Sequence, residues 1–253
     1  MFTLESLKGT NKIIVAGHRG YSARFPENSL LAFREAAEAG CHLIELDVTL
    51  SKDGVAMISH DDRLERVSNG TGLIVEHTCE ELKQLDFGAH HDALFHGTQI
   101  PTFRESMELI RSYPGVMVDV DFKIGPAIWE TLECALEIIK DLGMEDRCIF
   151  NSCDGAVVAY LHDKGYLTVG APRSFAEKVN YTEETYDKLW SVCIPMDELT
   201  PEAAKQYLDR GIIVAATSPD TKEQLRYALS CGATFMIVDE PRPALVLAQA
   251  LND

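Results

Sequence analysis

The fold is decided by the stretch HLIELDVTLSKDGVAMISHD, from His42 to Asp61. Two apolar runs flank a polar turn that ends in Asp53-Gly54. Asp-Gly between two such runs is typical of a tight β-hairpin turn. The run after the turn is therefore expected to pair antiparallel to the run before it.

This hairpin also predicts a cluster of polar side chains. Pairing across the turn places His60 opposite the segment from Glu45 to Asp47. Side chains alternate along a strand, so the two carboxylates lie on the same side. The sequence therefore predicts an imidazole beside two carboxylates without any long-range assumption.

Beyond this stretch, short β-branched runs alternate with helical patterns. Strands are expected near 13–17, 42–48, 55–60, 116–122, 148–152, 167–171, 191–195, 212–217 and 234–238. Helices are expected over 29–39, 102–112, 126–142, 154–164, 200–210, 220–231 and 241–251. Alternation of this kind favours parallel βα units closed into a barrel. With the hairpin strand set aside as an excursion, the prediction is an α/β fold, a TIM-type (β/α)8 barrel.

Residues 51–100 do not contain a barrel-type βα unit. Turn-forming residues and several histidines indicate a loop-rich insertion with little core of its own. Insertions after barrel strands lie over the C-terminal rim, where barrel active sites form. We therefore expect residues 1–253 to form a single barrel domain with a small subdomain inserted after the second strand.

Composition restricts the partners of the protein. The 253 residues include 40 acidic and 23 basic side chains, a formal net charge of −17. Such a surface repels nucleic acids and anionic membranes, and no apolar run is long enough to insert in a bilayer. A small-molecule substrate is expected instead, and the sequence leaves the oligomeric state open.

Cysteine usage and the first residues indicate a compartment. The seven cysteines contain no CxxC pair, which favours ordinary thiols in a reducing environment. Residues 1–11 lack the basic-then-apolar order of a secretory signal. We therefore expect a cytoplasmic protein.

Three carboxylates are candidate metal ligands. Asp121 lies on the predicted strand over 116–122, which would neighbour the strand that carries Glu45 and Asp47. Crowded carboxylates repel one another unless a cation lies among them. Ligation by oxygen alone suits Mg²⁺ or Ca²⁺ better than Zn²⁺.

Two histidines and two basic residues accompany these acids. His18 and His60 each end a predicted strand, and imidazole can accept or donate a proton near neutral pH. They are candidates for general base and general acid. Arg19 and Lys123 are the adjacent cations, which could hold phosphate oxygens.

The order of short motifs is also informative. The motifs are Gly17-His18-Arg19-Gly20, Pro26-Glu27-Asn28-Ser29, Glu45-Leu46-Asp47-Val48, Ser51-Lys52-Asp53-Gly54, His60-Asp61, Ile100-Pro101-Thr102-Phe103 and Asp121-Phe122-Lys123. In this order they resemble the glycerophosphodiester phosphodiesterase family, closely in the N-terminal half and loosely beyond it.

The resemblance implies a TIM-type barrel and one divalent cation, Mg²⁺ or Ca²⁺, held by the three carboxylates named above. His18 and His60 match the acid–base pair of the family. Arg19 and Lys123 match its phosphate contacts. The implied reaction splits a glycerophosphodiester into glycerol 3-phosphate and an alcohol, with the glycerol hydroxyl of the substrate attacking phosphorus first. Such an attack is intramolecular, which favours it through positioning.

The chain departs from the family pattern at four places. Asp121 replaces the usual Glu and shortens the side chain by about 1.5 Å. Cys153 replaces an aromatic residue. Ala216 replaces a tryptophan, which would remove a ring from the glycerol site. The usual Thr-Asp-x-Pro becomes Val238-Asp239-Glu240-Pro241.

Two alternative functions follow from these features. The departures motivate a catalytically weak protein of the same fold that binds a phospho-metabolite without turnover. A barrel lyase or isomerase would account for the acids and a metal. It would give no reason for two histidines at strand ends beside Arg19.

Overall fold

A computed structural model describes residues 3–7, 12–175 and 178–252 of the chain. Eight parallel strands form a closed barrel, because β1 pairs with both β2 and β9. Around the barrel they are β1 (Ile14–Gly17), β2 (Leu43–Leu50), β4 (Met117–Phe122), β5 (Cys148–Ser152), β6 (Thr168–Gly170), β7 (Ser191–Pro195), β8 (Ile213–Thr217) and β9 (Phe235–Val238). The predicted TIM-type barrel is confirmed.

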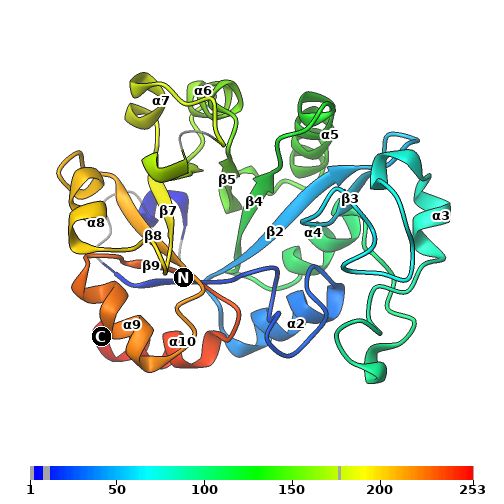
Figure 1. The fold of residues 1–253 in the computed structure, drawn as a ribbon, viewed down its shortest axis with the longest axis horizontal. Coiled ribbons are helices and arrows are strands. Elements are labelled where there is room, and N and C mark those ends of the chain that lie inside the picture. Colours follow the sequence, from blue (N-terminus) through cyan, green and yellow to red (C-terminus); the bar gives the residue numbers. More distant parts are fainter. Residues whose placement is uncertain (1–2, 8–11, 176–177, 253) are drawn as a thin grey trace.

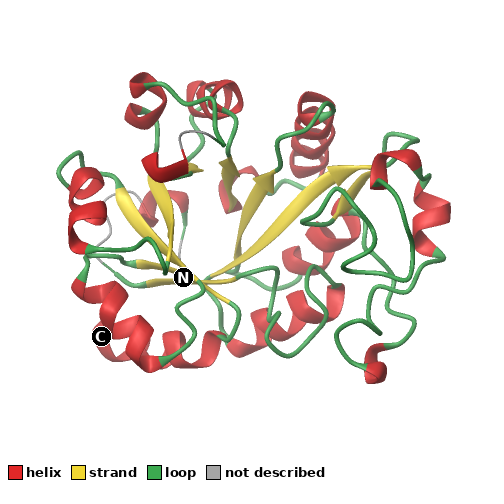
Figure 2. Cartoon of the chain, viewed as in Figure 1, coloured by secondary structure: helices red, strands yellow, loops and turns green. Residues whose placement is uncertain are grey.

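Helices surround the strands (Figures 1 and 2). The seven expected from the sequence are α2 (Leu30–Ala39), α4 (Phe103–Arg111), α5 (Ile128–Asp141), α6 (Gly155–Asp163), α8 (Pro201–Leu208), α9 (Lys222–Ser230) and α10 (Pro241–Asn252). Three short helices were not predicted: α1 (Leu4–Leu7), α3 (Cys79–Lys83) and α7 (Glu183–Asp187). Each spans four or five residues, too few to show a helical period. No helix in the described ranges has the length and apolar character needed to cross a membrane.

Capping residues determine where the helices begin. Thr102 accepts a hydrogen bond from the Glu105 backbone N–H, and the Glu105 side chain accepts one from the Thr102 backbone. This capping box satisfies two donors that the first turn of α4 would otherwise leave without partners. Ser29, Asp154 and Thr221 cap α2, α6 and α9 through their side-chain oxygens.

The predicted hairpin is confirmed at the end of β2. Strand β3 (Ala56–Ile58) runs antiparallel to β2, with Val48 opposite Ile58. Gly54 turns the chain at φ 79°, and its N–H donates to the Ser51 carbonyl over 3.0 Å. A left-handed φ suits glycine, which has no Cβ to clash. Strand β3 is the ninth strand and stays outside the closed barrel.

The interior of the barrel is apolar at the amino-terminal ends of its strands. Ile14, Leu43, Met117, Ile149 and Phe235 are at most 1% exposed and form one cluster there. Two further apolar clusters include the outward faces of the strands and the helices that cover them. This packing leaves the carboxyl ends of the strands as the place where polar side chains gather.

Residues 51–100 contain more apolar packing than the sequence indicated. Seven buried side chains form a cluster: Met57, Leu64, Val67, Ile74, Leu82, Phe87 and Ile100. They come from loops, short helical turns and β3, so their spacing shows neither a helical nor a strand period. The segment, which includes α3, extends beyond the end of β2 and lies beside α4 (Figure 1). The expectation of little core was therefore wrong.

Gly20 and Gly40 both have left-handed backbones, and replacing Gly20 by alanine is expected to destabilise the fold more than replacing Gly40. A Cβ at Gly20, where φ is 84°, would lie 2.6 Å from the Ala32 carbonyl carbon. Gly40, the C-cap of α2 at φ 96°, has nothing within 4 Å of such a Cβ. Gly40→Ala should therefore lower the free energy of unfolding by about 1–2 kcal/mol from the backbone alone. Gly20→Ala should cost about 1–3 kcal/mol more, from overlap.

Urea unfolding of the two variants beside the parent chain measures this difference. Equal losses of stability in Gly20→Ala and Gly40→Ala would show that α2 can move away from the loop after β1, contrary to the close approach described here.

Candidate functional site at the mouth of the barrel

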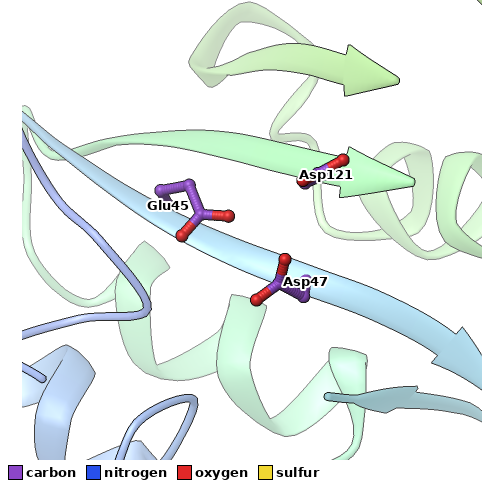
Figure 3. Close-up of side chains that lie close together, drawn as sticks. All are labelled: Glu45, Asp47 and Asp121. Carbon is purple, nitrogen blue, oxygen red and sulfur yellow. The ribbon is translucent and has the colours of Figure 1, made fainter. Parts of the chain in front are cut away.

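The parallel register of β2 and β4 builds the candidate site. It pairs Glu45 with Asp119 and Asp47 with Asp121. Glu45, Asp47 and Asp121 each offer a carboxylate oxygen, and these oxygens lie within 4.8 Å of one another. Figure 3 shows them side by side on the two strands. The sequence predicted that Asp121 approaches the other two acids because their strands are neighbours. The structure confirms that the three side chains lie close together.

Two cations lie against these acids. Lys123 Nζ is 2.7 Å from Asp47 Oδ1 and 2.5 Å from Asp121 Oδ2. Arg19 Nε is 3.5 Å from Asp47 Oδ2. Burial alone would raise the pKa of Asp47, but the charges of Lys123 and Arg19 outweigh it and hold that pKa well below its usual value. Asp47 is therefore a carboxylate at neutral pH.

Glu45 has a different environment on the same strand. Burial and the nearby charge of Asp47 raise the pKa of Glu45 well above its usual value. Its Oε2 accepts a hydrogen bond from the Arg19 backbone N–H over 2.7 Å. Arg19 adopts φ 56°, a left-handed conformation that is uncommon outside glycine. The loop after β1 is thus held against β2 by this contact.

Asn28 is a site residue to which sequence reasoning gave no role. Its Nδ2 donates to Asp47 Oδ2 over 2.8 Å, and its side chain is buried. Its φ of 56° is also left-handed, and asparagine tolerates this region better than most residues. The sequence analysis used Pro26-Glu27-Asn28-Ser29 only as one motif of the family resemblance, and in the structure its Ser29 caps α2.

Asp119 lies one step deeper in the barrel. It is fully buried, and neither of its carboxyl oxygens has a hydrogen-bond partner among the described residues. Burial, together with the charge of Asp121, raises the pKa of Asp119 well above its usual value. A neutral acid avoids the large cost of an isolated buried charge. Asp119 therefore separates the charged mouth from the apolar floor of the barrel.

The donor set at the mouth fits a hard divalent cation. All three clustered side chains offer carboxylate oxygen, the ligand atom that Mg²⁺ and Ca²⁺ prefer. Asp47 Oδ1 already has Lys123 Nζ at 2.7 Å, so a bound cation would share this carboxylate with the lysine. The raised pKa of Glu45 reflects burial and crowding of the acids, and a bound cation would favour its ionised form.

His18 directly follows β1 and is held by an acid that directly follows the last strand, β9. Its Nδ1 is 2.7 Å from Asp239 Oδ1, and Ser22 Oγ donates to the same oxygen over 2.9 Å. Burial opposes ionisation of Asp239, but the hydrogen bond and charge of His18 lower its pKa below the usual value. Sequence reasoning gave Asp239 no role, because its approach to His18 depends on barrel closure through β1 and β9.

His60 follows β3 and is also held by an acid. Its Nδ1 is 2.7 Å from Asp61 Oδ1. The Ser59 N–H donates to the Asp47 carbonyl over 3.0 Å, so the chain leading into His60 remains paired with β2. Burial lowers the pKa of His60, and Lys123 adds to this effect while Asp47 opposes it. The expected proximity of His60 to the acids of β2 is confirmed.

Arg66 connects the inserted segment to the site. Its guanidinium contacts Asp61 Oδ2 at 2.5 Å and Glu27 Oε2 at 2.7 Å. Glu27 in turn accepts from Arg19 Nη1 over 2.9 Å. Sequence reasoning missed Arg66, because no motif relates it to residues 39 positions away in the sequence. These ion pairs connect the residues beside His60 with the residue after His18.

The structure corrects one expectation about the departures from the family pattern. Ala216 is fully buried among apolar side chains between the barrel and its outer helices, in a cluster with Ile194 and Ala204. Alternation along β8 turns its neighbour Thr217 inward, where its hydroxyl is 2.7 Å from Cys193 Sγ. A ring at position 216 would therefore lie in the outer packing layer. The expected loss of a glycerol contact was wrong.

Comparison with known proteins shows which family the chain belongs to. The sequence profile of the Glycerophosphoryl diester phosphodiesterase family matches residues 18–242. A glycerophosphodiester phosphodiesterase of Caldanaerobacter subterraneus subsp. tengcongensis is 29% identical over 248 residues, which cover 94% of this chain and 98% of that protein.

Solved structures have the same fold. A phosphodiesterase from Oleispira antarctica, in complex with the product sn-glycerol-3-phosphate, superposes with a TM-score of 0.82 at 25% identity, covering 96% of this chain and 98% of that one. A glycerophosphodiester phosphodiesterase from Thermotoga maritima gives a TM-score of 0.68 at 27% identity, covering 94% and 99%. The chain therefore belongs to the glycerophosphoryl diester phosphodiesterase family and is an enzyme of the phosphoric diester hydrolase class.

Proposed function

We propose that this enzyme hydrolyses glycerophosphodiesters to glycerol 3-phosphate and an alcohol with the help of one divalent cation and a pair of histidines. The observation that carries the proposal is the carboxylate cluster at the barrel mouth, which lies near two histidines, each paired with an aspartate. The family supports the reaction, and the local geometry supports these residues as its machinery.

Glu45, Asp47 and Asp121 would hold the cation. When bound, a divalent ion such as Mg²⁺ or Ca²⁺ neutralises phosphate charge and polarises the phosphoryl oxygens. The shorter Asp121 suits this role because its carboxylate already reaches the other two. A protein that binds without turnover was suggested by the short side chain at this position, and the geometry removes that reason.

One histidine would take the proton of the attacking hydroxyl, and the other would give a proton to the leaving-group oxygen. Each Nδ1 is beside a carboxylate oxygen, which favours the tautomer that carries hydrogen on Nδ1 and leaves Nε2 for the substrate. We assign His18 as the base that takes a proton from the attacking hydroxyl. We assign His60 as the acid: it enters the reaction as the imidazolium and gives its Nε2 proton to the departing alcohol. Water then opens the cyclic phosphate, with the now neutral His60 taking a proton from the water and the protonated His18 returning one to the glycerol hydroxyl.

Arg19 and Lys123 would bind the phosphate. Both lie within ion-pair distance of Asp47, so they occupy the same small region as the proposed ligands. An anionic phosphodiester approaching a protein of net charge −17 needs such local positive charge. A lyase or isomerase acting on a neutral carbonyl compound would not need this pair of cations.

The setting of the site is part of the proposal. We place residues 51–100 over the C-terminal rim, as an insertion in a single barrel domain, because Arg66 from that segment reaches Glu27 and Asp61.

We place the protein in the cytoplasm, since all seven cysteines belong to the described residues and are free thiols. The acidic surface argues against nucleic acids and anionic membranes as partners.

The reaction is tested by the release of glycerol 3-phosphate from glycerophosphocholine and glycerophosphoethanolamine, with Mg²⁺, with Ca²⁺ and with chelator. We expect release that depends on the added cation, because three clustered carboxylates repel phosphate without it. Full activity in chelator would remove the cation from the proposal. No release from any glycerophosphodiester would contradict the reaction itself.

Replacement of either histidine should slow turnover strongly. We expect His18→Ala and His60→Ala each to lower kcat by about 100-fold or more, because general acid–base catalysis contributes that much. His162→Ala is the matched control, since His162 lies at the exposed end of α6 and its side chain pairs with its neighbour Asp163. Steady-state kinetics on glycerophosphocholine measures the effect. Turnover close to that of the control would exclude the replaced histidine from the mechanism.

The ligand assignment can be tested by binding rather than activity. Asp47→Asn removes a ligand charge and should weaken Mn²⁺ binding by at least about tenfold, since even changes to the partners of ligands have effects of that size. Asp121→Glu restores the usual family residue and should retain binding. Asp209→Asn, at the exposed end of α8, is the control. Electron paramagnetic resonance of added Mn²⁺ gives the affinities. Unchanged affinity in Asp47→Asn would place the ion elsewhere.

A further inference from the structure

A cavity of about 200 Å³ opens beside His60 and Lys123. It lies between the inserted segment, which contributes Leu73 and Val75, and the connection from β4 to α5, which contributes Ile124. The mechanism described above uses only its inner end. The rest of the cavity leads away from the carboxylate cluster.

The position of the cavity relates it to the departing alcohol. His60 is the proposed proton donor to the leaving oxygen, so that oxygen must come within hydrogen-bond reach of His60. Lys123, the cationic side chain that lines the same cavity, is the proposed phosphate contact. A substrate whose phosphate and leaving oxygen meet these two residues has its remaining carbon atoms directed into the cavity.

The chemistry of the lining selects the type of alcohol. The outer part is mostly aliphatic, with Leu73 and Val75 on one wall and Ile124, Pro126 and Ile128 on the other. Ile124 is 53% exposed, a large apolar side chain left uncovered at a cavity. Burial of apolar surface from a ligand against such walls is favourable.

A cationic alcohol such as choline fits this lining less well. Sites for quaternary ammonium groups are usually built from aromatic rings, and no aromatic residue is among the described residues that line the cavity. Of the two acids that line the cavity, Asp61 is already paired with Arg66 and Asp62 is exposed to water, which screens its charge, while Lys123 would repel a second cation. An uncharged aliphatic group avoids both problems.

We propose that this cavity is the leaving-group subsite and that the enzyme prefers glycerophosphodiesters whose alcohol carries an uncharged alkyl chain. The proposal rests on the proposed function. An apolar cavity of about 150 Å³ binds a benzene ring, so one of about 200 Å³ holds roughly the first six carbons of a chain. A longer chain would extend into solvent.

The test is a series of glycerophospho esters of ethanol, butanol, hexanol and decanol, assayed beside glycerophosphocholine. Primary alcohols of this series are equally good leaving groups, so differences report binding alone. We expect kcat/KM to rise roughly 2- to 4-fold per added methylene up to hexanol and then to level off. The hexyl ester should exceed glycerophosphocholine.

Variants locate the effect. Val75→Asn and Ile124→Asn should each lower the ratio of hexyl to ethyl kcat/KM by about fivefold or more. Val246→Asn makes the same change on the exposed face of α10, away from the cavity, and should leave that ratio unchanged. Two variants on opposite walls keep the test valid if one of them fails to fold.

Binding provides a readout that does not need turnover. His18→Ala with Mg²⁺ should bind the hexyl ester more tightly than the ethyl ester by calorimetry, and adding Ile124→Asn should remove the difference. A flat or falling series, or tighter binding of glycerophosphocholine than of the hexyl ester to His18→Ala, would overturn the subsite while the proposed function stands. Failure of every ester to react would contradict the proposed function, and the binding series would still decide the subsite.

Discussion

The alignment of β2 with β4 is the constraint on which this site depends. It brings four carboxyl groups, those of Glu45, Asp47, Asp119 and Asp121, into one part of the barrel interior. Buried like charges are costly unless cations, hydrogen bonds or protons compensate them. The protein uses all three: cationic side chains beside Asp47, the Arg19 backbone N–H on Glu45, and a neutral Asp119 with no partner.

The same compensation creates binding capacity. Along β2, the inward side chains change from Leu43 to Glu45 and Asp47, so the interior passes from apolar packing to concentrated charge within one short strand. Apolar side chains fill the amino-terminal end of the barrel, so water cannot reach the charges from that end to screen them. A divalent cation and an anionic phosphate together would neutralise the mouth better than either one alone, which is the physical reason to expect them as a pair.

The supporting residues come from distant parts of the chain. Asp239 reaches His18 because the last strand closes the barrel against the first. Arg66 reaches Asp61 and Glu27 because the insertion folds back over the loop after β1. His18, His60 and their partners are therefore held by barrel closure and by the inserted segment, and the same segment forms one wall of the cavity beside His60.

Local sequence patterns were enough for the barrel, the hairpin and the three clustered acids. Strand periodicity and the Asp-Gly turn act over a few residues, so they determine strand directions and the face on which Glu45 and Asp47 lie. The partners Asn28, Asp239 and Arg66 were missed, and the orientation of Ala216 was misjudged. Those features depend on barrel closure and on how loops pack, which are set by contacts between residues far apart in sequence. The periodicity of a sequence does not report contacts between distant residues, so these partners and this orientation were decided only by the tertiary structure.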